Sequence, residues 1–204
     1  MRMRTWSLLA AIAAAACGGY DAPSEVVYGS LAYSQANPDA LNKFPALRTY
    51  YLDPLMEVWQ DGEQQVSQPV PAATVTVVQT NMTKYGYTQV TANPGPGQNP
   101  NADVGLRFAY LKSLNVYYYS GGYCSIYWAY YACWPGWAYA GSYTSGTVIG
   151  LMLDTKSSVG GHILWATGLY GVLSGTTLDN TTRLNDALNR AFAQSEYLKT
   201  SVAP

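Results

Sequence analysis

The chain has 204 residues and a formal net charge of −1 at neutral pH. Charged residues make up 11% of it, whereas an ordinary soluble domain contains about 25%. This balance, without any cluster of basic residues, excludes nucleic acid as a partner bound through charge. The length suffices for one domain with a single hydrophobic core.

The first sixteen residues have the layout of a secretory signal peptide. Arg2 and Arg4 precede an uncharged stretch, residues 5–16, which ends in three alanines directly before Cys17. A charged start, a short apolar region and small residues at the cleavage site are typical of such a signal. The stretch is shorter than the roughly 20 residues that span a bilayer, so we expect a cleaved signal at 1–16 and not a membrane helix.

Cys17 resembles the acylated cysteine of a bacterial lipobox, which receives lipid, palmitate included, and becomes the new N-terminus. The position three before it is usually Leu, whereas here it is Ala14, and the same alanines also suit an ordinary signal peptidase. Export is expected in either case. Gly18 stands where an aspartate would signal retention in the inner membrane. We therefore expect a protein of the bacterial cell envelope, anchored by lipid at Cys17, with the outer membrane favoured.

Cys124 and Cys133 remain as a pair once Cys17 carries lipid. In an oxidising compartment they are expected to form a disulfide that closes a small loop. A redox pair usually has a two-residue gap, and a structural zinc site needs four ligands. The single histidine, His162, stands beside two turn glycines and is expected at the surface. We expect no metal and no cofactor.

Hydrophobic periodicity predicts the elements of the first half. Residues 17–43 are expected as the lipidated N-terminus and tether, and 44–200 as a single domain. A first strand is expected at 48–52, ended by Asp53-Pro54. The stretch 67–86 fits a strand, because valines alternate with threonines, and also a helix capped by Ser67, because apolar residues recur at helical spacing.

Alternation predicts a strand at 104–110, and further strands are expected at 88–91, 147–153 and 163–173. A Pro/Gly loop is expected at 93–101 and a hairpin connection at 155–161. A closing amphipathic helix carries its apolar stripe on Leu184, Ala187, Leu188, Ala191 and Phe192, with Asn180 or Thr181 as its cap. Strands between two helices indicate an α+β domain: an antiparallel β-sheet of about four to five strands with two helices packed on one face.

The order of these motifs resembles one bacterial lipoprotein family. The motifs are Lys-Tyr-Gly-Tyr at 84–87, Gly-Thr-Val-Ile-Gly-Leu-Met-Leu-Asp at 146–154, Ile-Leu-Trp-Ala-Thr-Gly at 163–168 and the closing helix. Together they are similar to the domain-of-unknown-function family 4136, over about residues 44–199. The resemblance favours a helix at 67–86. It implies an exported, usually lipid-anchored α+β domain, and it implies no activity.

An aromatic-rich insertion loop at about 117–143 is the most informative segment. No charged residue occurs between Lys112 and Asp154, and the loop holds nine tyrosines and three tryptophans. Such side chains combine an apolar face with a polar tip. The loop could bind a partner protein, stack on sugars or rest on membrane headgroups, or it could fold back and cover the sheet. The candidate binding residues are Tyr123, Tyr127, Trp128, Tyr130, Tyr131, Trp134 and Trp137.

Catalytic motifs are absent from the sequence: we find no nucleophile elbow, phosphate loop or metalloprotease helix. Asp53, Glu57, Asp61 and Glu63 form an acidic cluster near Trp59. We therefore expect a non-catalytic envelope lipoprotein that serves in interaction or assembly, with an envelope protein as partner. The alternative is a protein that binds or processes peptidoglycan or another glycan, with these carboxylates beside an exposed tryptophan.

Overall fold

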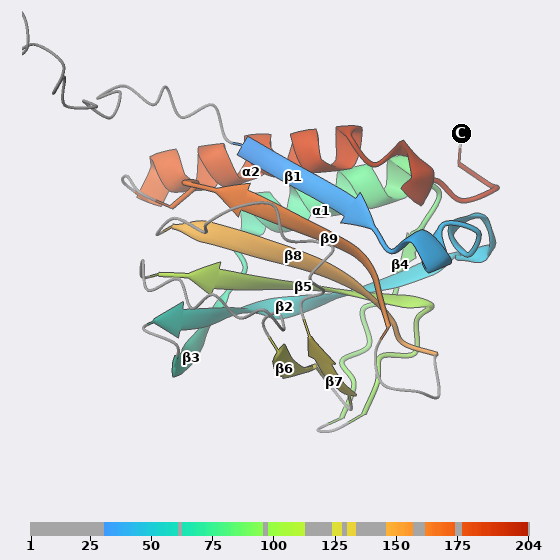
Figure 1. The fold of residues 1–204 in the computed structure, drawn as a ribbon, viewed down its shortest axis with the longest axis horizontal. Helices are drawn as coiled ribbons and strands as arrows, with labels where there is room; N and C mark the ends of the chain where they lie inside the picture. Colours follow the sequence, from blue (N-terminus) through green and yellow to red (C-terminus); the bar gives the residue numbers. More distant parts are fainter. Residues whose placement is uncertain are drawn as a thin grey trace, which may run out of the picture.

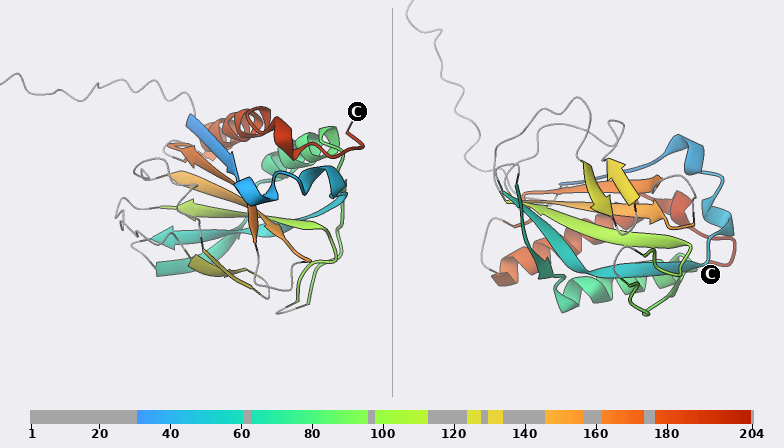
Figure 2. Two further views of the ribbon diagram at one scale, coloured as in Figure 1. Left: turned by 45° about the vertical axis from the view of Figure 1, so that its right-hand side comes forward. Right: turned by 90° about the horizontal axis from the view of Figure 1, so that it is seen from below.

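The computed structural model describes residues 31–60, 63–95, 98–112, 124–127, 130–133, 146–156, 162–173 and 177–203. Two helices, α1 (Ala72–Lys84) and α2 (Thr177–Ala193), lie side by side on one face of a sheet (Figures 1 and 2). Neither helix, nor any other in the described ranges, is long and apolar enough to cross a membrane.

The main sheet has the strand order β1-β9-β8-β5-β2-β3, and β4 pairs with the start of β2. Its strands are β1 (Leu31–Ala36), β2 (Thr49–Gln60), β3 (Glu63–Pro69), β4 (Thr88–Gln89), β5 (Val104–Leu111), β8 (Thr147–Asp154) and β9 (Ile163–Tyr170). A separate hairpin consists of β6 (Cys124–Tyr127) and β7 (Tyr130–Cys133). Short 3-10 helices occupy Pro38–Ala40, Phe44–Ala46 and Glu196–Leu198.

The predicted α+β class, with two helices on one face, is confirmed, but the sheet is larger than expected and mixed. Strand β2 runs parallel to both β4 and β5, whereas the other pairings are antiparallel. Parallel neighbours require a crossover connection, and α1 lies in the connection between β2 and β5. The predicted antiparallel hairpin of β8 and β9 is confirmed.

Three elements differ from the prediction: β1 was not expected, and β2 and α1 have other boundaries. Strand β1 lies in the stretch that we expected as a tether, and it pairs with β9 from Leu31↔Tyr170 to Ala36↔Trp165. Strand β2 continues through Asp53-Pro54, because a register shift between Leu52 and Met56 accommodates the proline. The predicted helix at 67–86 starts at Ala72, because Glu63–Pro69 pairs with β2 as an edge strand.

The end of α1 has the pattern of a helix terminated by glycine. The helix ends at Lys84, and Gly86 adopts φ 87°, a conformation that glycine tolerates best. A Cβ atom on Gly86 would also clash with the hydroxyl oxygen of Thr200. The backbone amide of Thr200 donates to the carbonyl of Tyr85 at 2.9 Å. The C-terminal segment therefore packs directly onto the turn after α1.

The predicted apolar stripe of α2 is confirmed as core. Its five residues, Leu184, Ala187, Leu188, Ala191 and Phe192, are all at most 2% exposed. The helix starts at Thr177, so the expected caps Asn180 and Thr181 lie in its first turns. Polar pairs join the two helices: Thr74 Oγ1 donates to Asn185 Oδ1, and Asn81 Nδ2 to Asn189 Oδ1, each at 2.8 Å.

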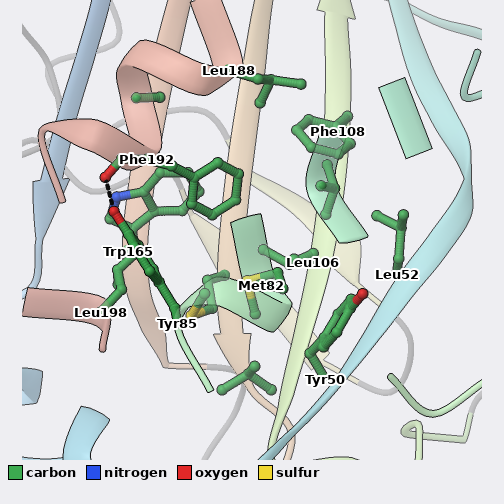
Figure 3. Packing of buried hydrophobic residues seen from close by; sticks show 14 of the residues in the cluster. Tyr50, Leu52, Met82, Tyr85, Leu106, Phe108, Trp165, Leu188, Phe192 and Leu198 are labelled. Atoms are coloured by element: carbon green, nitrogen blue, oxygen red, sulfur yellow. Dashed lines mark hydrogen bonds between the residues drawn. The ribbon is translucent and has the colours of Figure 1, made fainter. Parts of the chain in front are cut away.

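Aromatic side chains dominate the core between helices and sheet (Figure 3). Trp165 stacks on Phe192 with ring centroids 5.6 Å apart, and Tyr85 meets Phe192 edge-on at 5.9 Å. The Tyr85 hydroxyl donates to the Phe192 carbonyl, and the Tyr87 hydroxyl donates to the Leu198 carbonyl. Burial raises the pKa of Tyr85 to about 12, so these hydroxyls stay protonated hydrogen-bond donors at neutral pH.

Candidate functional site

The face of the sheet opposite α1 and α2, here called the outer face, carries a second apolar cluster. It comprises Ala109, Ile149, Leu151, Leu153, Ile163 and Ala166, with Trp59 and Leu111 packed against it. Leu151 and Leu153 are 2% and 0% exposed, although both helices lie on the other side of the sheet (Figure 2). The hairpin β6–β7 lies on this side (Figure 2). The outer face is thus an interior surface and not a solvated one.

An ionic cluster occupies the outer face beside this apolar cluster, over β2 and β5. Leu52 pairs with Leu106 and Met56 with Phe108, so three residues of β2 lie opposite Arg107 alone. This bulge accommodates Pro54, which has no amide to donate. It also sets Asp53 and Glu57 on either side of the guanidinium.

Arg107 forms ion pairs with both carboxylates. Its Nη2 lies 3.2 Å from Glu57 Oε1, and its Nε lies 3.0 Å from Asp53 Oδ2. The Nε–H is not aimed at that oxygen, so charge attraction rather than a hydrogen bond makes the second contact. The side chains of Arg107, Asp53 and Glu57 are 14%, 11% and 3% exposed. Such limited hydration strengthens the attraction and makes the loss of any partner costly.

The remaining oxygens of the two carboxylates are also engaged. Trp59 donates from its indole nitrogen to Glu57 Oε2 at 3.1 Å, and Asp53 Oδ1 accepts from the amide of Leu55 at 2.9 Å. Nearby, burial and the charge of Asp53 raise the pKa of Tyr51, while Arg107 lowers it. Two carboxylates, one guanidinium and one indole therefore form a single hydrogen-bonded and ion-paired unit.

This arrangement is suited to holding strands together more than to acid–base chemistry. A glycosidase needs one carboxyl group that donates a proton and another that faces the sugar or a water. Here the oxygens of Glu57 contact Arg107 and Trp59, and Glu57 is 2% exposed as a residue. Within the described ranges, no group of three or more His, Cys, Asp or Glu residues is placed to hold a metal ion.

Comparison with known proteins places the chain in a family. The model of the family DUF4136, a domain of unknown function, matches residues 33–195. The chain is a DUF4136 protein. No curated protein matches it. A crystal structure of a DUF4136 family protein from Bacteroides thetaiotaomicron VPI-5482 has the same fold, with a TM-score of 0.59 and 24% identity over 83% of this chain and 97% of that chain.

The match to DUF4136 confirms the resemblance seen in the motifs, and it includes most of β1, which pattern alone did not predict. It also spans the ionic cluster and the hairpin β6–β7. It ends at Ser195, before the C-terminal segment that packs on Gly86. The family carries no assigned activity, so the match shows which domain this is and leaves its function to physical argument.

The backbone of the DUF4136 domain brings the two predicted disulfide cysteines together. Cys124 on β6 lies directly opposite Cys133 on β7, and Tyr127 lies opposite Tyr130 next to the turn. Directly opposed residues of an antiparallel pair have Cα atoms about 4.5–5.5 Å apart, within the range that a disulfide bridges. Tyr131, opposite Ile126, completes the predicted residues within the hairpin.

The other predicted site residues lie outside the described residues: Cys17, Tyr123, Trp128, Trp134 and Trp137. His162 is exposed, as expected, and its carbonyl accepts the amide of Asp154 at 2.9 Å. Of the predicted acidic cluster, the structure brings Asp53, Glu57 and Trp59 together. Glu63 is exposed on the edge strand β3, and Asp61 lies outside the described residues.

Sequence reasoning did not single out Arg107, which organises the cluster. A signal for it existed: Arg107 is the one charged residue in the strand Val104–Leu111, whose other members are apolar or glycine. A charge within a strand that is buried on both faces requires a partner of opposite sign. The acidic residues of a neighbouring strand are then the natural candidates, although the pairing of β2 with β5 is visible only in the fold.

Proposed function

We propose that this protein is a non-catalytic lipoprotein of the bacterial cell envelope, most favourably of the outer membrane, and that it serves as an interaction or assembly module. Its anchor is a lipid on Cys17, and its contact element is the Tyr/Trp-rich connection between β5 and β8. The observation that carries the proposal is the position of the hairpin β6–β7 on the outer face, away from both helices (Figure 2).

Two properties of that connection support a contact role. It contains nine tyrosines and three tryptophans in residues 117–143, and no charged residue occurs from 113 to 153. Aromatic residues are enriched, and charged ones depleted, in the buried centres of protein interfaces. The buried outer face indicates in addition that part of the aromatic sequence serves as a cover for the sheet.

Photo-crosslinking in intact cells tests the contact role. A crosslinking amino acid at position 130, in β7, should give a discrete protein adduct. The same probe at position 66, on the edge strand β3 where Val66 is 87% exposed, is the control and should give none. Adducts to lipid or glycan alone, or no adduct at position 130, would contradict a protein partner.

Replacement of two tryptophans distinguishes binding of a partner from packing against the sheet. Trp134→Ala combined with Trp137→Ala should abolish capture of the crosslinked partner while the thermal unfolding of the domain stays cooperative. A domain that loses its cooperative unfolding would show instead that these side chains belong to the core.

The lipid is tested separately, because Cys17→Ser should remove the acyl mass and release the protein from membranes.

A glycan-binding or glycan-processing protein is the second candidate. The observation in its favour is that Asp53, Glu57 and Trp59 lie together on the outer face. Arg107 neutralises much of their charge, which weighs against a reactive pair. Glu57→Gln keeps the shape of the side chain, so a loss of peptidoglycan binding without unfolding would favour this candidate, and unchanged binding would remove it.

A further inference from the structure

We infer that the end of the sheet at which β1 begins faces the membrane, so that the lipid surface itself is the partner of that end of the domain. We call this the near end of the sheet. The opposite end, where β1 finishes, is the far end. The inference rests on the proposed lipid anchor at Cys17, and it adds which surface of the domain contacts the bilayer.

The strand register places the entry of the chain and the aromatic connection at the same end. Leu31, the first residue of β1, pairs with Tyr170 at the end of β9. One strand further, Val148 pairs with Leu169, and Thr147 pairs with Leu111 at the end of β5. The connection between β5 and β8 therefore leaves and returns at the same end of the sheet as the one where β1 begins (Figure 1).

The length of the preceding chain limits how the domain can sit. Thirteen residues, 18–30, separate Cys17 from Leu31. Their fourteen steps span at most about 48 Å when fully extended, and less in any other conformation. The eight residues of β8 cover about 26 Å from the near to the far end. To place the far end against the bilayer, residues 18–30 would have to extend along the whole length of the sheet. That alone would take more than half of their maximum length.

The distribution of charged residues also favours the near end as the side that faces the membrane. Among the residues whose side chains the structure describes, the near end carries Glu63, Lys112 and, in the second turn of α2, Arg183. The far end carries nine charged residues: Asp39, Lys43, Arg48, Lys84, Asp103, Asp154, Lys156, Glu196 and Lys199. Moving charges out of water is costly, so the near end approaches an apolar boundary at the smaller cost. The entry of the chain at β1, the reach of residues 18–30 and the distribution of charge thus point to one end of the domain.

Depth-sensitive fluorescence quenching tests the orientation. The acylated full-length protein is purified from bacterial membranes. It is labelled at Gln64→Cys, at the near end, or at Leu41→Cys, at the far end; both residues are exposed. It is placed in vesicles of phosphatidylethanolamine and phosphatidylglycerol that contain a headgroup nitroxide. Since the ends lie about 26 Å apart and such quenching needs near contact, position 64 should be quenched at least about twofold more strongly.

A second pair of probes controls for the local environment of the label. Lys112→Cys and Lys43→Cys remove the same charge at the near and the far end, and both lysines are exposed. The near-end probe should again be quenched more. Equal quenching at the two ends, stronger quenching at the far end, or no quenching at either would overturn the inference.

Flotation of the vesicles distinguishes a wrong orientation of the domain from the absence of the proposed lipid anchor. A protein that floats with the vesicles and carries the acyl mass on its Cys17 peptide, yet shows equal quenching, retains the anchor and refutes the orientation. A protein that neither floats nor carries the acyl mass refutes the anchor, and the orientation falls with it.

Discussion

Trp165 on β9 donates from its indole nitrogen to the hydroxyl of Ser195 at 2.9 Å, and so ties the sheet to the end of α2. The two residues are 1% and 0% exposed. Ser195 in turn donates to the carbonyl of Ala191 at 2.8 Å and accepts from the hydroxyl of Tyr197 at 3.3 Å. One small hydroxyl thus joins the largest buried side chain, the last turn of a helix and the following segment.

Ser195→Ala should lower the free energy of unfolding by about 1–3 kcal/mol, because it leaves the buried N–H of Trp165 without its acceptor. Urea unfolding measures the loss. In Trp165→Phe the donor is gone, so adding Ser195→Ala to that variant should cost clearly less than it does alone. Costs that simply add would show that the two groups are not coupled.

Arg107→Met should destabilise the domain by about 3 kcal/mol, since it leaves Asp53 and Glu57 on the outer face without their cation. Lys43→Met is the matched control. Lys43 lies 3.4 Å from Asp154 and its side chain is 48% exposed, so its removal should cost less than about 1 kcal/mol. Adding Glu57→Gln to Arg107→Met should recover part of the loss. Equal costs for the two single variants would contradict a desolvated cluster.

Asp103 should make the domain less stable in acid. Burial opposes its ionisation, but hydrogen bonds from Lys156 and from the amides of Arg48 and Thr49 outweigh it and lower the pKa of Asp103 from 3.8 to about 2. A carboxyl whose pKa is lower in the folded state stabilises that state above its unfolded pKa, near 4, and loses this effect as the pH falls toward 2.

The resulting contribution is about 2 kcal/mol at neutral pH, since the Asp103 side chain is 18% exposed. Asp103→Asn should therefore unfold at lower urea than the parent at pH 7, and the difference should shrink as the pH approaches 2. A difference that stays constant with pH would assign the effect to shape and not to charge. Lys156→Met is the control for the exposed ammonium, whose own share should stay below about 1 kcal/mol.

If the protein resides in the envelope as proposed, its cysteine pair should be oxidised after isolation without reductant. Cys124 lies opposite Cys133 across β6–β7, so peptides that contain them should be linked before reduction and separate after it. Removal of the bridge by Cys124→Ala with Cys133→Ala should lower stability by about 2–3 kcal/mol, if the closed loop acts through chain entropy. Separate peptides before reduction would refute the bridge.

Local patterns predicted the elements that depend on neighbours in sequence. The i, i+3, i+4 stripe of α2 is buried as expected, and alternation located β5 within a few residues. The strands expected at 147–153 and 163–173 correspond to β8 and β9. Strands β1 and β3 were missed because neither shows clean alternation: β3 is an edge strand whose residues are almost all exposed. A strand of that kind is defined by its partner, and the partner is not visible in its own sequence.

The candidate site, too, was predicted only in part from the sequence. Composition alone marked the uncharged aromatic stretch and the acidic residues near Trp59. That Asp53 and Glu57 meet on one guanidinium could not be predicted, because Arg107 is some fifty residues distant and reaches them through a parallel pairing that depends on the α1 crossover.

The order of motifs in the sequence identified the family, and this resemblance, together with spacings of two to four residues, determined the α+β class and the two-helix layer. Only the tertiary structure decided the strand order, the ionic cluster on the outer face and the shared end at which β1 enters and the aromatic connection departs. These are relations between residues far apart in the chain, and they form when strands pair, a step set by the packing of the whole sheet and not by any local preference.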